Sequence, residues 1–119
     1  MTKEQALHSF WSSVGLTAYE ENSVPSGENK PDLPYITYEV ATDHFESELL
    51  LSGNLWYEGN SWEKINAKTD EIANRINNYV IVGCALIKPA SPFATNVPDI
   101  NDRIRRKKIN ITVEFLTVN

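Results

Sequence analysis

The sequence is poor in the residues that build metal centres and catalytic sites. It holds one cysteine, Cys84, and two histidines, His8 and His44. A single cysteine excludes a disulfide within the chain, and without clustered partners it cannot complete a zinc site. We expect His8 to be an exposed helix residue and Cys84 to belong to the core, and no G-x-S-x-G motif is present. The sequence therefore predicts no catalytic residues, no metal and no enzymatic activity.

Long apolar runs and glycine-rich loops are also missing. No stretch approaches the roughly 18 apolar residues of a membrane helix, and residues 1–10 lack the basic-then-apolar layout of a signal peptide. No glycine-rich loop opens a helix, so phosphate binding of the P-loop or Rossmann type has no support. We expect a protein of the cytoplasm that binds no cofactor and no membrane.

Basic charge is scarce over most of the chain. Residues 1–102 hold six Lys/Arg and fifteen Asp/Glu, a net charge of −9, whereas residues 103–119 hold five and one, a net of +4; the sum is the −5 of the 119-residue chain. Five of the six residues 103–108, hereafter the basic segment, are basic. A duplex-binding domain usually carries positive charge over a whole face. We therefore expect no sequence-specific nucleic-acid binding.

Apolar periodicity predicts two helices in one domain, residues 1–119. Thr2 and Gln5 form a capping-box pattern before an apolar stripe, and Gly15 follows that stripe as a stop. The second helix is capped by Asn60 or Ser61 and ends at residues 77–78. The first stripe comprises Leu7, Phe10, Trp11 and Val14, and the second comprises Trp62, Ile65, Thr69, Ile72, Ala73, Ile76 and Val80.

Alternating apolar residues predict about four strands. They cover residues 34–41, 46–59, 83–89 and 103–118, with a hairpin at residues 42–45 and long loops at residues 20–34 and 90–102. The order α-β-β-α-β-β favours an α+β fold with a single antiparallel sheet and both helices on one face. In the last strand the basic segment should project roughly 17 Å beyond the helix cover.

Acidic residues surround the predicted hairpin and offer a partner for the basic segment. Asp43, Glu46 and Glu48 flank Phe45; residues 43–48 are hereafter the acidic segment. Within one sheet the two segments would form exposed pairs of about 0.2–1 kcal/mol each. Between subunits, complementary charge would instead fix register and orientation. Loop aromatics either pack on their own core or serve an interface. The candidate subunit-interface residues are Asp43, Phe45, Glu46, Glu48, Phe93, Arg103, Arg105, Arg106 and Lys107.

The chain resembles small neck and tail-completion proteins of long-tailed bacteriophages, in particular tail terminators. The resemblance lies in "ALHSFWSSVGLTAYEENSVP", "LPYITYEVATD", "LWYEGNSWEKINAKTDEIA", "IKPASPFA" and "RRKKINITVEFLTVN". It implies an α+β subunit without enzymatic activity that forms a six-membered ring. That ring would cap the head-proximal end of the tail tube in the virion, with the tail tube protein and a head-completion or connector protein as partners.

Two other functions stay open. A head-closure or connector-adaptor protein would also form rings but would bind the portal side. A single-strand nucleic-acid-binding module would use Tyr35, Tyr38, Trp56 and Tyr57 as stacking platforms. That module requires these aromatics on an uncovered sheet face close to Arg105 and Arg106.

Overall fold

Helix α1 (Lys3–Ser12) opens the computed structural model, which describes residues 1–41 and 48–116. Thr2 Oγ1 accepts a hydrogen bond from the Gln5 backbone N–H at 3.1 Å, and Gln5 Oε1 accepts one from the Thr2 N–H at 2.8 Å, which confirms the predicted capping box. All four residues of the predicted stripe are buried, with Leu7 and Trp11 almost wholly so. The stripe therefore faces the core as predicted.

Helix α2 (Glu63–Ile76) also follows its predicted stripe. Ser61 Oγ accepts a hydrogen bond from the Glu63 N–H at 3.1 Å, and Asn77 ends the helix with a positive φ of 54°. The hydroxyl of buried Thr69 donates to the Ile65 carbonyl at 2.8 Å, so this polar group is satisfied inside the core. The buried members of the stripe are Ile65, Thr69, Ile72 and Ile76.

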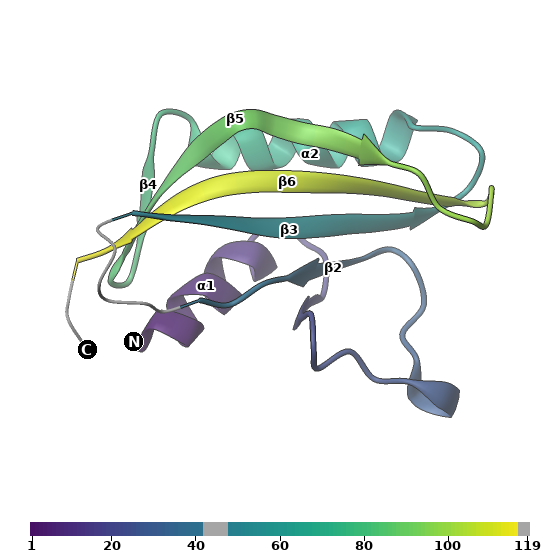
Figure 1. The fold of residues 1–119 in the computed structure, drawn as a ribbon, viewed down its shortest axis with the longest axis horizontal. Helices are drawn as coiled ribbons and strands as arrows, with labels where there is room; N and C mark the ends of the chain where they lie inside the picture. The colour runs from purple at the N-terminus through teal and green to yellow at the C-terminus, as the bar shows by residue number, and fades with distance from the viewer. Residues whose placement is uncertain (42–47, 117–119) are drawn as a thin grey trace.

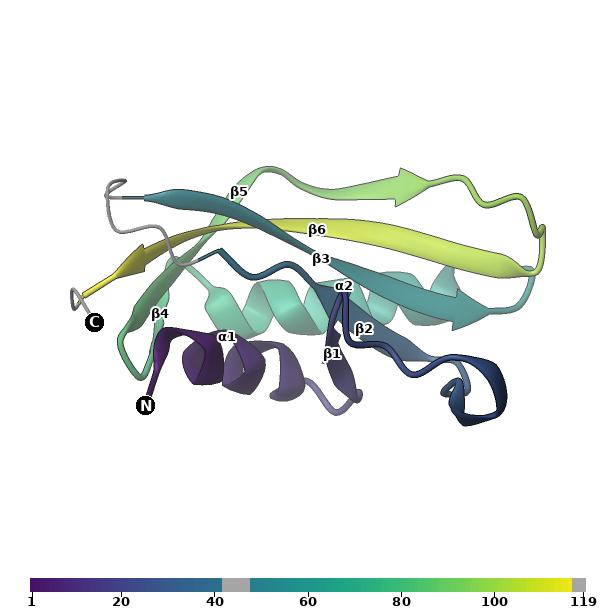
Figure 2. The same ribbon diagram turned by 60° about the horizontal axis from the view of Figure 1, so that its bottom comes forward.

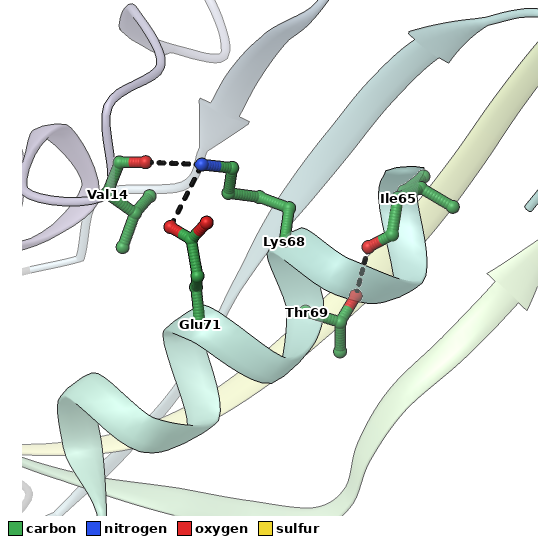
Figure 3. A network of polar contacts seen from close by, with 5 residues as sticks. All are labelled: Val14, Ile65, Lys68, Thr69 and Glu71. Carbon is green, nitrogen blue, oxygen red and sulfur yellow. Dashed lines mark hydrogen bonds and ion pairs between the residues drawn. The ribbon is translucent and has the colours of Figure 1, made fainter. Parts of the chain in front are cut away.

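A lysine of α2 ties the two helical segments together (Figure 3). Lys68 Nζ donates to the Val14 carbonyl, just beyond the end of α1, at 2.7 Å and pairs with Glu71 at 2.9 Å. Carbonyls past a helix end lack helical partners, and a cation there also complements the helix dipole. Lys68 therefore fixes how α2 lies against the exit of α1.

Over the described residues the sheet has six strands and is mixed, so the prediction of about four antiparallel strands was wrong in number and in one pairing. The order β1-β2-β3-β6-β5-β4 is antiparallel except for β1, which runs parallel to β2. β1 and β4 span three residues each, too few for periodicity to reveal. The strands are β1 (Ala18–Glu20), β2 (Tyr35–Tyr38), β3 (Leu49–Glu58), β4 (Val80–Val82), β5 (Ala85–Val97) and β6 (Ile104–Phe115), with a 3-10 turn at Gly27–Asn29. The hairpin at residues 42–45 lies outside the described residues.

The sheet curls around a helical layer on one side, here called the helix face (Figures 1 and 2). α1 contacts β1 at one edge and β4 at the other, while α2 contacts β3, β5 and β6. Alternate residues of β6 point into this layer, and Ile109, Ile111 and Val113 are completely buried there. The α+β class with both helices on one face is therefore correct, and the opposite side of the sheet is hereafter the open face.

Strand β5 replaces most of the loop predicted at residues 90–102. It continues to Val97, and its register with β6 shifts between Pro89 and Ala94. Proline has no N–H for the ladder, but an irregularity interrupts the ladder and so accommodates it. Asn110 of β6 stabilises the irregularity, since its Nδ2 donates to the Pro92 carbonyl at 2.9 Å. Only residues 98–103, hereafter the tip loop, connect β5 to β6.

Candidate functional site

The helix-face half of the basic segment is held by its own chain. Arg105 lies over the Trp62 ring at 5.4 Å, and its guanidinium donates to the Asp102 and Asn60 carbonyls at 2.6 and 3.0 Å. Lys107 Nζ donates to Asn66 Oδ1 of α2. The predicted 17 Å projection beyond the helix cover is therefore wrong. Strand β3 pairs with β6 as far as Ile104, and the start of α2 covers this face.

The open-face half of the basic segment is more accessible. Arg106 lies over the Trp56 ring at 4.7 Å and donates from Nε to Asn54 Oδ1 at 3.0 Å, whereas Lys108 is exposed. Sequence reasoning did not select Lys108, although strand alternation puts it on the face of Arg106. Arg103 is exposed and lies 3.9 Å from Glu58, an ion pair that solvent makes weak.

Within residues 1–41 and 48–116, Glu58 is the one carboxylate at ion-pair distance from any residue of the basic segment. The described part of the acidic segment is far away. Glu48 is exposed and precedes Leu49, which pairs with Val113, whereas Arg106 pairs with Trp56 at the other end of β3. Eight residues at about 3.3 Å each separate Glu48 from Trp56 by about 26 Å, several times the screening length of about 8 Å. Glu48 therefore cannot neutralise the basic segment of its own subunit.

The other candidate interface residues divide by position. Phe93 is half-buried and packs against the core, which satisfies its apolar ring inside its own subunit. Asp43, Phe45 and Glu46 lie outside the described residues.

The aromatic platform required for single-strand binding is split between two faces. Tyr35 and Trp56 share the open face, with ring centroids 6.4 Å apart, but Tyr38 and Tyr57 face the helices. Tyr35 is only 7% exposed, and Arg106 already occupies the Trp56 ring. Beside them lies a shallow pocket of about 290 Å³, lined by Lys30, Leu33, Tyr35, Trp56, Asp99, Asn101 and Ile104. Few aromatic ring faces therefore remain free for nucleic-acid bases to stack on.

Several exposed apolar side chains escaped the sequence analysis, among them one in the tip loop and a group at the other end of the molecule. Ile100 in the tip loop is fully exposed, at 106% of its reference surface. At the opposite end of the open face, an apolar patch is made by Tyr79 (59% exposed), Ile81 (54%), half-buried Leu86 and Leu116 (54%). Ile81 pairs directly with Leu86 across β4 and β5. The sequence gives one signal of these exposed residues: Ile100 is an isolated isoleucine between the polar residues Asp99 and Asn101.

The described part of the chain, residues 1–41 and 48–116, contains neither a cluster of metal ligands nor a helix that could span a membrane. No group of three or more His, Cys, Asp or Glu side chains there could hold a metal ion. No helix there has the length and apolarity to cross a bilayer. His8, exposed as predicted, forms polar contacts with the Tyr38 hydroxyl at 3.0 Å and the Ser12 hydroxyl at 3.3 Å.

Comparison with known proteins adds no relative, because neither family models nor curated proteins give a match to this chain.

Proposed function

We propose that the protein is a structural subunit of a phage neck, a tail terminator that forms a ring on the head-proximal end of the tail tube and joins it to the head. It acts by assembly, without catalysis or a cofactor. Its partners are further copies of itself, the tail tube protein and a head-completion protein.

One observation carries the proposal: opposite charges occupy opposite ends of the same strand pair. The basic segment lies where β3 ends and Glu48 lies where β3 begins, about 26 Å apart. Glu48 cannot pair with the basic segment of its own subunit, but the basic end of one copy can pair with Glu48 of the next. A contact between two unlike patches is heterologous, and it closes into a ring when the rotation permits.

The shape of the subunit supports the same conclusion. The molecule measures 42 × 31 × 22 Å, and its longest axis runs along β3 and β6 (Figure 1). Both ends are thus presented by one continuous sheet, whose pairing fixes their separation. A fixed distance between the basic end and the acidic end favours one ring size over a mixture of oligomers.

The proposal is tested by mixing the purified protein with tail tubes of the phage or prophage that encodes it. Electron microscopy should show density at one end of each tube. Decoration along the tube, or tubes left bare, would reject the terminator function. Binding to DNA-filled heads in place of tubes would favour the head-closure alternative.

Charge reversal tests the carrying observation. Arg103→Glu with Lys108→Glu should abolish end binding, and adding Glu46→Lys with Glu48→Lys should partly restore it. Arg103 and Lys108 are exposed, so the fold should survive. The matched control is Lys64→Glu with Arg75→Glu on the exposed side of α2, which changes the net charge equally and should bind normally.

A further inference from the structure

The second half of β5 forms a free edge of the sheet. β4 pairs only with Ala85–Ile87, so Ala94–Val97, hereafter the outer part of β5, have β6 on one side and no described strand on the other (Figure 2). The middle of β5 is protected against strand addition, because Lys88 is charged and Pro89 and Pro92 have no N–H to offer. The outer part contains neither lysine nor proline. It therefore lacks the side chains that usually block an exposed edge.

Two hydrogen bonds show which way the backbone groups of β6 point. The Gly59 N–H donates to the Arg103 carbonyl at 2.7 Å, on the β3 side of β6. The Leu116 N–H donates to the Cys84 carbonyl at 2.7 Å, on the β5 side. Bonding alternates along an antiparallel strand, so the even-numbered residues of β6 direct their backbone groups toward β5.

Two residues of the outer part therefore direct their backbone groups away from the sheet. Thr95 and Val97 lie opposite even-numbered residues of β6, so their N–H and C=O groups face β6. Those of Ala94 and Asn96 face outward, and they make no backbone–backbone hydrogen bond within residues 1–41 and 48–116. These outward groups repeat every two residues, at about 6.6 Å, which is the repeat of another extended strand. The partner that satisfies them is an extended segment.

The charge beside this edge favours an acidic segment. Lys108 lies opposite Thr95 on the open face, is exposed, and has no carboxylate at ion-pair distance among the described residues. Because Thr95 is small and uncharged, a long acidic side chain on an added strand can reach the Lys108 ammonium across it. The carboxylates of Asp99 and Asp102 belong to the tip loop, past the end of β5, and Asp99 already accepts the Asn101 N–H at 2.9 Å.

A second copy offers no matching strand at its described edges. The sheet ends at β1 and β4, each of three residues. Neither β4 nor the outer part of β5 contains an acidic residue. β1 contains one, Glu20, but its carboxylate already accepts hydrogen bonds from Asn22 and Ser23. The acidic segment therefore comes from a different protein.

We propose that the outer part of β5 is a docking edge for an extended acidic segment of a partner protein, which adds to the sheet beside β5. The segment exchanges backbone hydrogen bonds with Ala94 and Asn96, and one of its carboxylates pairs with Lys108. The backbone bonds require an extended conformation, and the ion pair selects acidic side chains. This inference goes beyond the proposed ring and needs no tail tube for its test.

Hydrogen exchange of the full chain, followed by NMR, tests the proposal with two synthetic peptides. In the free protein the amides of Ala94 and Asn96 should exchange faster than those of Thr95 and Val97. A capped Thr-Glu-Val-Glu-Thr-Glu peptide at millimolar concentration should slow exchange at Ala94 and Asn96 about tenfold. The same peptide with lysine in place of glutamate should not. Unchanged exchange at both residues, or equal protection by the two peptides, would overturn the proposal.

Two variants locate the contact. Asn96→Pro removes one outward N–H, which a sheet edge tolerates, and should weaken binding of the acidic peptide several-fold. Lys108→Glu should reverse the preference in favour of the lysine peptide. The matched control is Lys88→Glu, an exposed lysine beyond the irregularity of the same strand, which should bind like the wild type. Normal binding by Lys108→Glu would show that the ion pair is wrong.

Concentrated protein alone gives the remaining outcome. If the Ala94 and Asn96 amides become protected as the protein concentration rises without peptide, a second copy occupies the edge and the proposed partner is wrong. Binding to tube ends is measured separately by electron microscopy. Bare tubes together with peptide binding at the edge would reject the terminator function and leave this inference standing.

Discussion

Gly53 packs directly against an aromatic ring of α1. It lies on the helix face of β3, and a Cβ added there would meet the Trp11 ring at 2.6 Å. The absence of a side chain at this position therefore allows α1 to approach β3 closely. This packing buries the Trp11 indole Nε1, which has no hydrogen-bond partner among the described residues.

Gly53→Ala should lower the free energy of unfolding by about 1–3 kcal/mol, because the new methyl group must displace Trp11 from a packed core. Chemical denaturation measures this loss. Trp11→Phe removes part of the ring, so the cost of Gly53→Ala should shrink in that background. An equal cost in both backgrounds would show that Trp11 is not the obstacle.

Tyr57 links stability to high pH. Burial raises the pKa of its hydroxyl above the ordinary value of about 10, and the Glu71 carboxylate raises that pKa further. Well below pH 10 the hydroxyl is protonated in both the folded and the unfolded state, so this group costs no stability there. Above pH 10 it ionises first in the unfolded chain, and stability falls as the pH rises.

The free energy of unfolding should therefore decline between pH 9.5 and 11, and Tyr57→Phe should decline less steeply than the wild type. Exposed Tyr79→Phe is the control and should follow the wild type. A Tyr57→Phe curve parallel to that of the wild type would contradict this assignment.

At the scale of elements, Arg105 joins strand β6 to the corner between β3 and α2. Its guanidinium donates to the Asn60 carbonyl in that corner and to the Asp102 carbonyl in the tip loop, and it stacks on Trp62, although its Nε is buried without a partner among the described residues. An interface role assigned to Arg105 from sequence must therefore compete with these contacts. Arg103, two residues earlier, is exposed and makes only the weak pair with Glu58.

Arg105→Ala should cost about 1–3 kcal/mol of stability, since it removes two charge-assisted hydrogen bonds and a cation–π contact. Arg103→Ala should change stability by less than about 0.5 kcal/mol. Thermal unfolding of the two variants gives the comparison. Equal stabilities would mean that Arg105 does not support the corner.

Apolar periodicity in the sequence identified the helices and strands that are long enough to show a repeat. Both helical stripes, the inward residues of β3 and β6, and the antiparallel pairing of β2 with β3 follow from local patterns. β1 and β4 are too short to show alternating apolar and polar residues. Pro89 and Pro92 favoured a loop prediction where β5 in fact continues. The cover over Arg105 depends on where Trp62 lies in three dimensions, which no local pattern encodes.

At the scale of the whole molecule, the proposed assembly depends on charge carried at two ends. Exposed charges act over a screening length of about 8 Å at physiological salt and about 3 Å at 1 M. Binding of the protein to tube ends should therefore weaken several-fold between 0.05 and 1 M salt. The variant Arg103→Glu with Lys108→Glu should occupy few tube ends at any salt. Salt-independent binding to tube ends would show that these charges do not drive the assembly.

The irregularity in β5 divides that strand into parts of unequal stability. Residues 85–87 have β4 on one side and β6 on the other, whereas Ala94–Val97 are described with β6 alone as a ladder neighbour. The outer part and the tip loop can open as a local unit without breaking the ladder above the core. Such a unit absorbs inserted or deleted residues at little cost to global folding. A change of length there would therefore alter the reach of this end, and with it the angle between copies in the proposed ring, while the core stays the same.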